Sequence, residues 1–88
     1  MYQFGRPLST SLGRYVVVDA AICHGEPTFR GTRVLVADVL EQVASGMDWD
    51  AIVEEWHDAV PREAIGEAVR LGRELILTHK RDLAAAAE

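Results

Sequence analysis

The stretch from Ile22 to Leu35 constrains the fold most, because it sets two glycines and a proline between two apolar segments. Residues 14–19, which precede it, are mainly β-branched or aromatic and predict a short strand. Residues 32–36 predict a second strand. Since an isolated strand pair is only marginally stable in water, we expect this pair to pack on helices or to associate across a dimer.

After the strand pair, apolar residues recur at the spacing i, i+3, i+4, i+7, which predicts helices. The predicted apolar faces are Val36, Val39, Leu40 and Val43 on the first helix and Trp49, Ile52, Val53 and Trp56 on the second. The first helix covers residues 36–46, and Gly46 ends it as a left-handed cap. The second covers residues 48–57 with Asp48 as its N-cap, and the third covers residues 61–77. The predicted fold is mostly α: a three-helix, helix-turn-helix-like domain with a short N-terminal β-strand pair.

The chain of 88 residues is long enough for one domain with a modest core. Residues 14–80 are the predicted domain, residues 1–13 an N-terminal arm, and residues 81–88 a C-terminal extension that is helical or frayed. The arm holds apolar residues that can dock on a neighbouring protein, namely Tyr2, Phe4 and Leu8. The apolar face of the third helix comprises Ile65, Ala68, Val69, Gly72, Leu75 and Ile76.

The net charge of −5 and the pI of about 5.1 argue against a strongly basic, nucleic-acid-binding chain. An acidic chain can still present a local basic face or bind a basic protein. Cys23 is the only cysteine, which excludes a disulfide framework and favours a reducing cytoplasm. No apolar run approaches the roughly 18 residues of a membrane span. We therefore expect a soluble cytoplasmic protein with no membrane segment.

Arg30 and Arg33 lie on either side of a Gly-Thr pair, so two guanidinium groups share one tight loop. Such groups can bind phosphates or carboxylates in bidentate fashion. Alternatively, an arginine can tie the loop to a helix end or to an acidic residue. We favour the tie for Arg33 and leave both interpretations open for Arg30. Gly25 and Gly31 are expected to supply positive φ angles in turns.

Arginines on the third helix are the candidates for contact with DNA phosphates. They are Arg62, Arg70 and Arg73, with Arg30 of the loop as a further candidate. Glu63, Glu67 and Glu74 interrupt this basic side, so ion pairs between i and i+4 compete with duplex binding. An acidic patch around the second turn is typical of a solvated helix face, although it can also meet the basic surface of a partner protein. It consists of Glu54, Glu55, Asp58, Glu63 and Glu67.

Trp49 and Trp56 lie on one face of the second helix, where core packing is favoured over an interface with another protein. The histidines and Cys23 fit no zinc-ligand spacing, so no metal is expected, and Cys23 is interpreted as a small buried hydrophobic residue. No nucleophile–base pair or cofactor motif emerges. We therefore expect neither an enzyme nor a cofactor.

The run from Cys23 to Val34 resembles the signature of the bacterial family known as domain of unknown function 433. The family pattern is approximately I-C-G-G-x-P-x-I-x-G-T-R-I-x-V, and the resemblance covers about residues 16–77. The motif loop in this chain consists of Gly25, Pro27, Arg30, Gly31, Thr32 and Arg33. The chain departs from the pattern, or from residues common in the family, at Ala20, His24, Leu35 and Val60.

This resemblance implies a homeodomain-like helical fold and a homodimer. It also implies a VapB-type antitoxin of a type II toxin–antitoxin module, which binds and inhibits a PIN-like ribonuclease toxin. Autoregulation by binding of the dimer to its own promoter is a further implied role. The alternatives are a stand-alone helix-turn-helix DNA-binding regulator and a structural dimerisation module. In the antitoxin hypothesis, either residues 1–13 or the tail from Leu77 to Glu88 contacts the toxin.

Overall fold

The computed structural model describes residues 9–87, so the arm residues Tyr2, Phe4 and Leu8 lie outside the described part. The described chain is mostly helical, as predicted, and has four helices with a three-stranded antiparallel sheet. The strands are β1 (Ser9–Ser11), β2 (Val16–Asp19) and β3 (Thr28–Phe29), and a 3₁₀ turn covers Cys23–Gly25. The helices are α1 (Val36–Ala44), α2 (Trp49–Glu55), α3 (Arg62–Thr78) and α4 (Lys80–Ala87).

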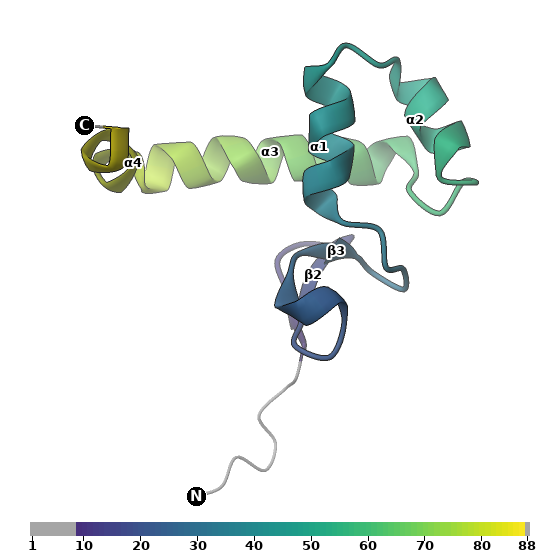
Figure 1. The fold of residues 1–88 in the computed structure, drawn as a ribbon, viewed down its shortest axis with the longest axis horizontal. Helices are drawn as coiled ribbons and strands as arrows, with labels where there is room; N and C mark the ends of the chain where they lie inside the picture. The colour runs from purple at the N-terminus through teal and green to yellow at the C-terminus, as the bar shows by residue number, and fades with distance from the viewer. Residues whose placement is uncertain (1–8, 88) are drawn as a thin grey trace, which may run out of the picture.

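The long helix α3 organises the molecule (Figure 1). Helix α1 crosses α3, and α2 lies beside the start of α3, whereas α4 lies at its far end. The small sheet packs at the base of α1, and β2 contacts α3. As a result, the other elements cover the first half of α3, and its second half projects from the body together with α4 (Figure 1).

The sheet differs from the predicted strand pair. Strand β2 confirms the first predicted strand, and it pairs with β3 in a register that places Val16 opposite Phe29. The second predicted strand, residues 32–36, was wrong: its pairing is limited to one isolated bridge between Thr28 and Leu35. Val36 instead begins α1, because its side chain belongs to the buried helical face that also contains Val39.

The strand β1 lies within residues 1–13, which were predicted to be an irregular arm. It is the edge strand of the sheet and pairs with β2 so that Ser9 lies opposite Asp19. All three residues of β1 are exposed. Because neither face is buried, the strand has no alternation of apolar and polar residues, which is the signal that predicts a strand.

The core lies between α1, α2, β2, β3 and the first half of α3. Its buried residues are Val16, Phe29, Val36, Val39, Ile52, Val60, Ala64, Ile65 and Ala68. Burial of a side chain such as Ile65 stabilises the fold by about 1.5–3 kcal/mol. The helical periodicity of the sequence therefore identified the faces of α1 and α2 and the first half of the α3 face.

The predicted helix ends hold in two places and shift in others. Asp48 caps α2, since its carboxylate accepts a hydrogen bond of 3.1 Å from the amide of Asp50, and Gly46 has a φ of +88° after α1. Helix α2 ends at Glu55 rather than at His57, because His57 and Asp58 both adopt positive φ angles. The C-terminal extension is helical and starts at Lys80, one residue inside the predicted domain.

None of the helices in the described residues combines the length and the apolar character that crossing a membrane requires.

Candidate functional site

The motif loop joins the sheet to α1. Gly25 and Gly31 have φ angles of +82° and +78°, which confirms their predicted role in turns. The Thr32 hydroxyl donates to the Phe29 carbonyl at 2.7 Å and accepts from the Val34 amide at 3.0 Å. These bonds close the turn locally, so the loop is built by its own backbone and the threonine side chain.

The side chain of Arg30 is bound inside the domain. Its Nε donates to the carbonyl of Arg14 at 3.0 Å, and its Nη2 donates to the hydroxyl of Ser11 at 2.8 Å and to the carbonyl of Gly13 at 3.2 Å. The guanidinium therefore ties the motif loop to the turn between β1 and β2. This geometry supports the structural interpretation of Arg30 over a phosphate clamp.

Arg33 and Cys23 differ from their predicted environments. The expected tie from the Arg33 guanidinium to a helix end or an acidic residue is not found among residues 9–87, and the side chain is exposed. Cys23 is half-buried rather than buried, and its Sγ lies 3.6 Å from the Arg33 carbonyl as a weak donor. Neither residue therefore belongs to the buried core.

Glu67 accepts more hydrogen bonds than any other acidic side chain in the described structure. The prediction that it belongs to a solvated acidic face was wrong. Its carboxylate accepts hydrogen bonds from the amides of Arg14, Tyr15 and Val16 at 2.8–2.9 Å. Burial raises the pKa of Glu67, but these three amides and the nearby Arg70 outweigh burial, so the net pKa is lowered. Glu67 thus fastens the start of β2 to α3.

Gly13 fits beside this carboxylate because it has no side chain. A Cβ at position 13 would lie 2.6 Å from the Glu67 carboxyl carbon, closer than any normal contact. The sequence holds no signal that links Gly13 to Glu67, because the two residues are distant in the chain and become neighbours only when α3 packs on β2.

The candidate DNA-binding arginines of α3 each have an acidic neighbour. Arg62 forms an ion pair of 2.7 Å with Asp50 and stacks on the Trp49 ring with its Cζ 5.5 Å from the centroid. The Arg73 guanidinium lies 3.2 Å from the Glu74 carboxylate. The third arginine, Arg70, acts on Glu67 through its charge. The second half of α3 therefore offers no uninterrupted basic face.

Both tryptophans pack against the core, as favoured from the sequence, and both stay half-buried. The Trp56 Nε1 donates to the Gln42 amide oxygen at 2.8 Å and so joins α2 to α1. Arg62 stacks on the Trp49 ring, so each tryptophan combines core packing with one polar contact.

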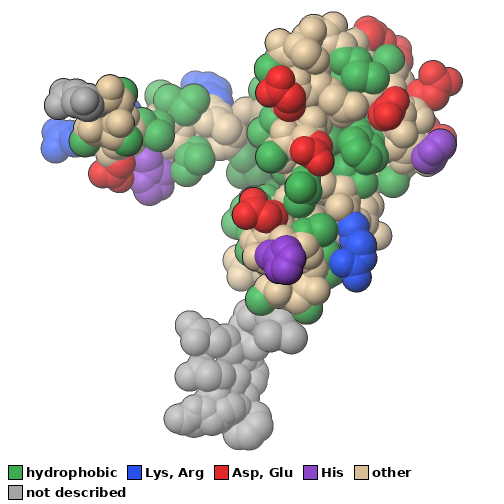
Figure 2. Space-filling model, in the orientation of Figure 1, with side chains coloured by type: hydrophobic (Ala, Val, Ile, Leu, Met, Phe, Trp, Pro, Cys, Tyr) green, Lys and Arg blue, Asp and Glu red, His purple; other side chains and the backbone are tan. Residues whose placement is uncertain are grey.

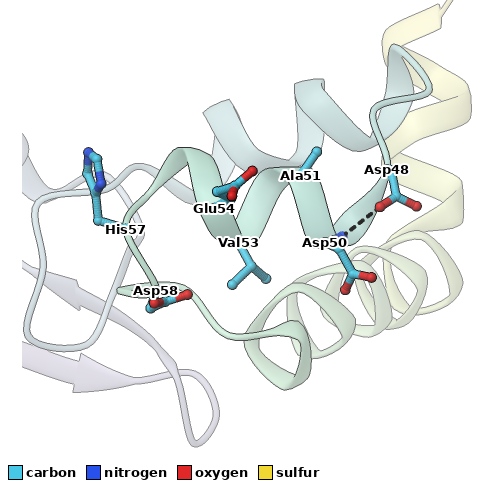
Figure 3. Close-up of a pocket in the computed structure, with 7 residues that line it drawn as sticks. All are labelled: Asp48, Asp50, Ala51, Val53, Glu54, His57 and Asp58. Atoms are coloured by element: carbon cyan, nitrogen blue, oxygen red, sulfur yellow. Dashed lines mark hydrogen bonds between the residues drawn. The ribbon is translucent and has the colours of Figure 1, made fainter.

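The acidic surface of α2 forms a shallow hollow (Figure 3). Its lining residues are Asp48, Asp50, Ala51, Val53, Glu54, His57 and Asp58. The carboxylates are spread along α2 rather than directed at one point (Figure 3). Among the described residues, no three His, Cys, Asp or Glu side chains are placed to hold a metal ion.

The projecting half of α3 and α4 carries the most exposed apolar side chains of the described chain. Leu75, Ile76 and Leu77 are 57%, 59% and 51% exposed, and Leu83 of α4 is 46% exposed. Leu75 and Ile76 were identified as part of the apolar face of the third helix, but the domain is too short to cover them. In Figure 2 this projecting part carries several hydrophobic side chains on the visible surface.

An apolar groove of about 430 Å³ runs between the body and this half of α3. Leu12, Val36 and Leu40 form its body wall, and Leu71, Gly72 and Leu75 are among the residues that form its α3 wall. The sequence gives no signal for this groove, because it depends on how far α1 and the sheet reach along α3.

The fold and these surfaces define a small, mostly helical domain with a projecting helix that exposes apolar side chains. The family model described as "Protein of unknown function (DUF433)" matches residues 16–70 of the chain. The chain therefore belongs to the DUF433 family, as the motif loop indicated. Comparison with curated proteins finds no match, and comparison with solved structures finds none either.

Proposed function

We propose that this protein is the antitoxin of a type II toxin–antitoxin module and acts as a homodimer in the cytoplasm. It binds and inhibits a PIN-like ribonuclease toxin through the end of α3 and α4. The observation that carries this proposal is the exposure of three consecutive apolar residues, Leu75, Ile76 and Leu77, on a helix that projects from the domain. Membership of the DUF433 family supports the choice of partner, through the resemblance described above.

Three consecutive helical residues point about 100° apart, so these side chains surround the helix rather than occupying one stripe. A helix that is apolar all round is normally buried. Scattered exposed apolar residues need no explanation, but a continuous exposed group is typical of a protein interaction site. Leu83 of α4 extends the same surface. A protein partner is therefore the natural cover for this part of the chain.

In this proposal, the toxin packs on the face of α3 that carries Leu77 and on α4. This assigns toxin binding to the tail from Leu77 to Glu88, one of the two segments considered from the sequence. The exposed acidic residues of α2, among them Glu54 and Glu55, supply a second surface for a basic ribonuclease groove.

Autoregulation through DNA is a separate part of the proposal. It requires a helix-turn-helix arrangement in which α2 supports α3 and α3 enters the major groove. Arg62 and Arg73, two of the arginines required for such contacts, are paired with acidic side chains. For this reason we favour toxin binding over a stand-alone DNA-binding regulator, and also over a structural dimerisation module.

The test is binding of the purified protein to the PIN-like ribonuclease encoded beside it, together with inhibition of RNA cleavage. We expect a stoichiometric complex and loss of cleavage. The variant Leu77→Glu should weaken the complex at least 10-fold, because it places a charge in the apolar interface. The exposed α1 variant Ala37→Glu is the matched control and should bind normally. A neighbouring ribonuclease that neither binds nor loses activity would refute the antitoxin function.

A further inference from the structure

The junction between α3 and α4 depends on a single residue. Helix α3 ends at Thr78 and α4 begins at Lys80. His79 lies between them with a φ of −113° and a ψ of 26°, away from the helical values of about −63° and −42°. In Figure 1, α3 is seen from the side and α4 nearly along its axis, so the chain turns sharply at this residue.

The helical hydrogen-bond pattern is interrupted across this junction. The His79 amide donates to the Leu75 carbonyl at 2.9 Å, and the Leu83 amide donates to the His79 carbonyl at 3.0 Å. Among the described residues, the three amides between them, those of residues 80–82, have no backbone acceptor. A continuous helix would bond these amides to the carbonyls of residues 76–78. The bend therefore removes three helical hydrogen bonds.

The sequence at the junction contains none of the residues that usually bend a helix. Sharp kinks occur mainly at proline, at glycine and serine, or where a group is inserted into the hydrogen-bond ladder. Residues 75–87 contain no glycine, proline or serine and consist mainly of leucine, alanine, lysine and arginine, which are good helix formers. Every described side chain of α4 is exposed. The direction of α4 is therefore not fixed by packing against the body.

Local charges are what favours the bend. Asp82 lies in the first turn of α4, where the helix macrodipole favours a negative charge. Its carboxylate also lies 3.4 Å from Nδ1 of His79. Both side chains are exposed, so these contributions are small and are screened by salt. The bend is thus stabilised by weak local contacts and opposed by the loss of three backbone hydrogen bonds.

We propose that the junction exchanges between this bent form and a straight form, in which one helix runs from Arg62 to Ala87. The straight form gains the three missing hydrogen bonds and loses the contact between His79 and Asp82. The exchange leaves the core intact, because the backbone changes mainly at His79, outside the body of the domain. This inference goes beyond the proposed function and does not depend on a toxin.

Straightening changes the apolar surface that the chain presents. In one continuous helix, residues at alternating spacings of three and four lie along one seam. The seam consists of Val69, Gly72, Ile76, His79, Leu83 and Ala86, with His79 as its polar member. In the bent form, Leu83 belongs to a helix that turns away from Ile76, so the seam is divided. In the straight form it is a single row about 25 Å long. The junction therefore controls whether the exposed apolar side chains of α3 and α4 form one surface.

The first test measures the distance between two spin labels by pulsed electron paramagnetic resonance. The labels are attached at Arg70→Cys and Ala86→Cys, two exposed positions on either side of the junction, in a chain that also carries Cys23→Ser. In a straight helix the two Cα atoms are about 24 Å apart, and the bent form brings them closer. We expect both distances in the chain with the natural junction.

Two variants should move the populations in opposite directions. Lys80→Pro should leave only the shorter distance, because proline is accepted at the first position of α4 but clashes with the Ile76 carbonyl in a straight helix. His79→Ala should raise the ratio of straight to bent chains about 3–10-fold, since alanine favours the helix and cannot contact Asp82. Raising the salt concentration should also raise this ratio.

The matched control is Arg73→Ala, an exposed change to alanine inside α3, which should leave the ratio unchanged. A single distance that His79→Ala does not alter would overturn the proposal, whichever form it represents. An equal response in Arg73→Ala would overturn it too, because the effect would then not be located at the junction. Failure to bind a toxin would contradict only the antitoxin function, so the two proposals fail separately.

Amide hydrogen exchange tests the same junction without labels. The amides of residues 80–82 are bonded only in the straight form, so in the natural chain their protection should lie between that of the α3 amides and that of an unstructured peptide. It should rise in His79→Ala, and the protection of Arg81 and Asp82 should be lost in Lys80→Pro. Exchange at the rate of an unstructured peptide in both the natural chain and His79→Ala would contradict the straight form.

Discussion

The first half of α3 lies inside the domain, whereas the second half of the same helix lies outside it (Figure 1). Both halves continue one apolar pattern, yet Ile65 is fully buried and Leu75 is 57% exposed. The difference arises from the neighbouring elements, because α1, α2 and the sheet reach only part of the way along α3. An apolar helix face therefore indicates that something covers it, but not whether the cover comes from the same chain.

The largest expected effect comes from comparing one residue of each half. Ile65→Ala should lower the free energy of unfolding by about 2–5 kcal/mol, because it leaves a cavity in the core. Leu75→Ala should lower it by less than about 0.5 kcal/mol in the monomer, since this side chain has little packing to lose. Urea unfolding at low protein concentration measures both changes. Equal losses would show that the second half of α3 is covered within one chain.

The contact between Glu67 and β2 should come next in size. Glu67→Ala removes the acceptor of three backbone amides and should destabilise the fold by about 2 kcal/mol, since solvent replaces the carboxylate only in part. The comparison is Glu74→Ala in the projecting half, whose carboxylate contacts exposed Arg73 and should change stability by less than about 0.5 kcal/mol. If the two variants unfold alike, Glu67 does not hold the sheet to α3.

The same carboxylate predicts a pH dependence. Its pKa in the folded chain lies below the ordinary value of 4.5, so the unfolded chain binds a proton more readily than the folded chain. The stabilisation is therefore complete above pH 4.5 and is lost as the pH falls through the lower folded pKa. Urea unfolding between pH 3 and pH 7 should show a smaller loss in Glu67→Gln than in the natural chain. Identical pH profiles would contradict this.

Two glycines should respond to alanine in opposite directions. Gly13→Ala should destabilise the chain by about 1–2 kcal/mol, because the new methyl group meets the bound Glu67 carboxylate at 2.6 Å. Gly72→Ala should stabilise the monomer by about 0.5–1 kcal/mol, because alanine favours the helix and meets nothing in the chain. Thermal unfolding of dilute protein measures both. A loss of stability in Gly72→Ala would mean that the groove is closed in the monomer.

The smallest effect is expected at the surface of α2. Arg62→Ala removes an exposed ion pair with Asp50 and the stacking on Trp49, and it should change the free energy of unfolding by less than about 1 kcal/mol. Raising the salt concentration should reduce that difference further. A change above about 2 kcal/mol would show that Arg62 is needed for packing of α2 on α3.

Local features of the fold could be predicted from the sequence. The positive φ angles of Gly25 and Gly31, the Asp48 cap and the buried faces of α1 and α2 each depend on residues close together in the chain. Membership of the DUF433 family also followed from one short motif. These predictions succeed because turn and helix geometry are determined by steric contacts and hydrogen bonds between near neighbours.

The contacts of the candidate sites could not be predicted in the same way. The role of Arg30 stayed open from the sequence because Ser11 and the other groups that it binds lie 16–19 residues earlier. Glu67 contacts amides that lie 51–53 residues away. Its position on a helix among other acidic residues was therefore interpreted as a solvated face.

The sequence by itself determined the helical faces, the turns and the family, because periodicity and glycine positions act locally. Only the tertiary structure decided that β2 pairs with β3 rather than with a strand at residues 32–36, and that β1 adds an edge strand to the sheet. It also decided how far α1, α2 and the sheet extend along α3, which leaves Leu75 and its neighbours exposed. The physical reason is that the burial of a side chain depends on the lengths and the packing of several elements together. The sequence of one segment does not determine this.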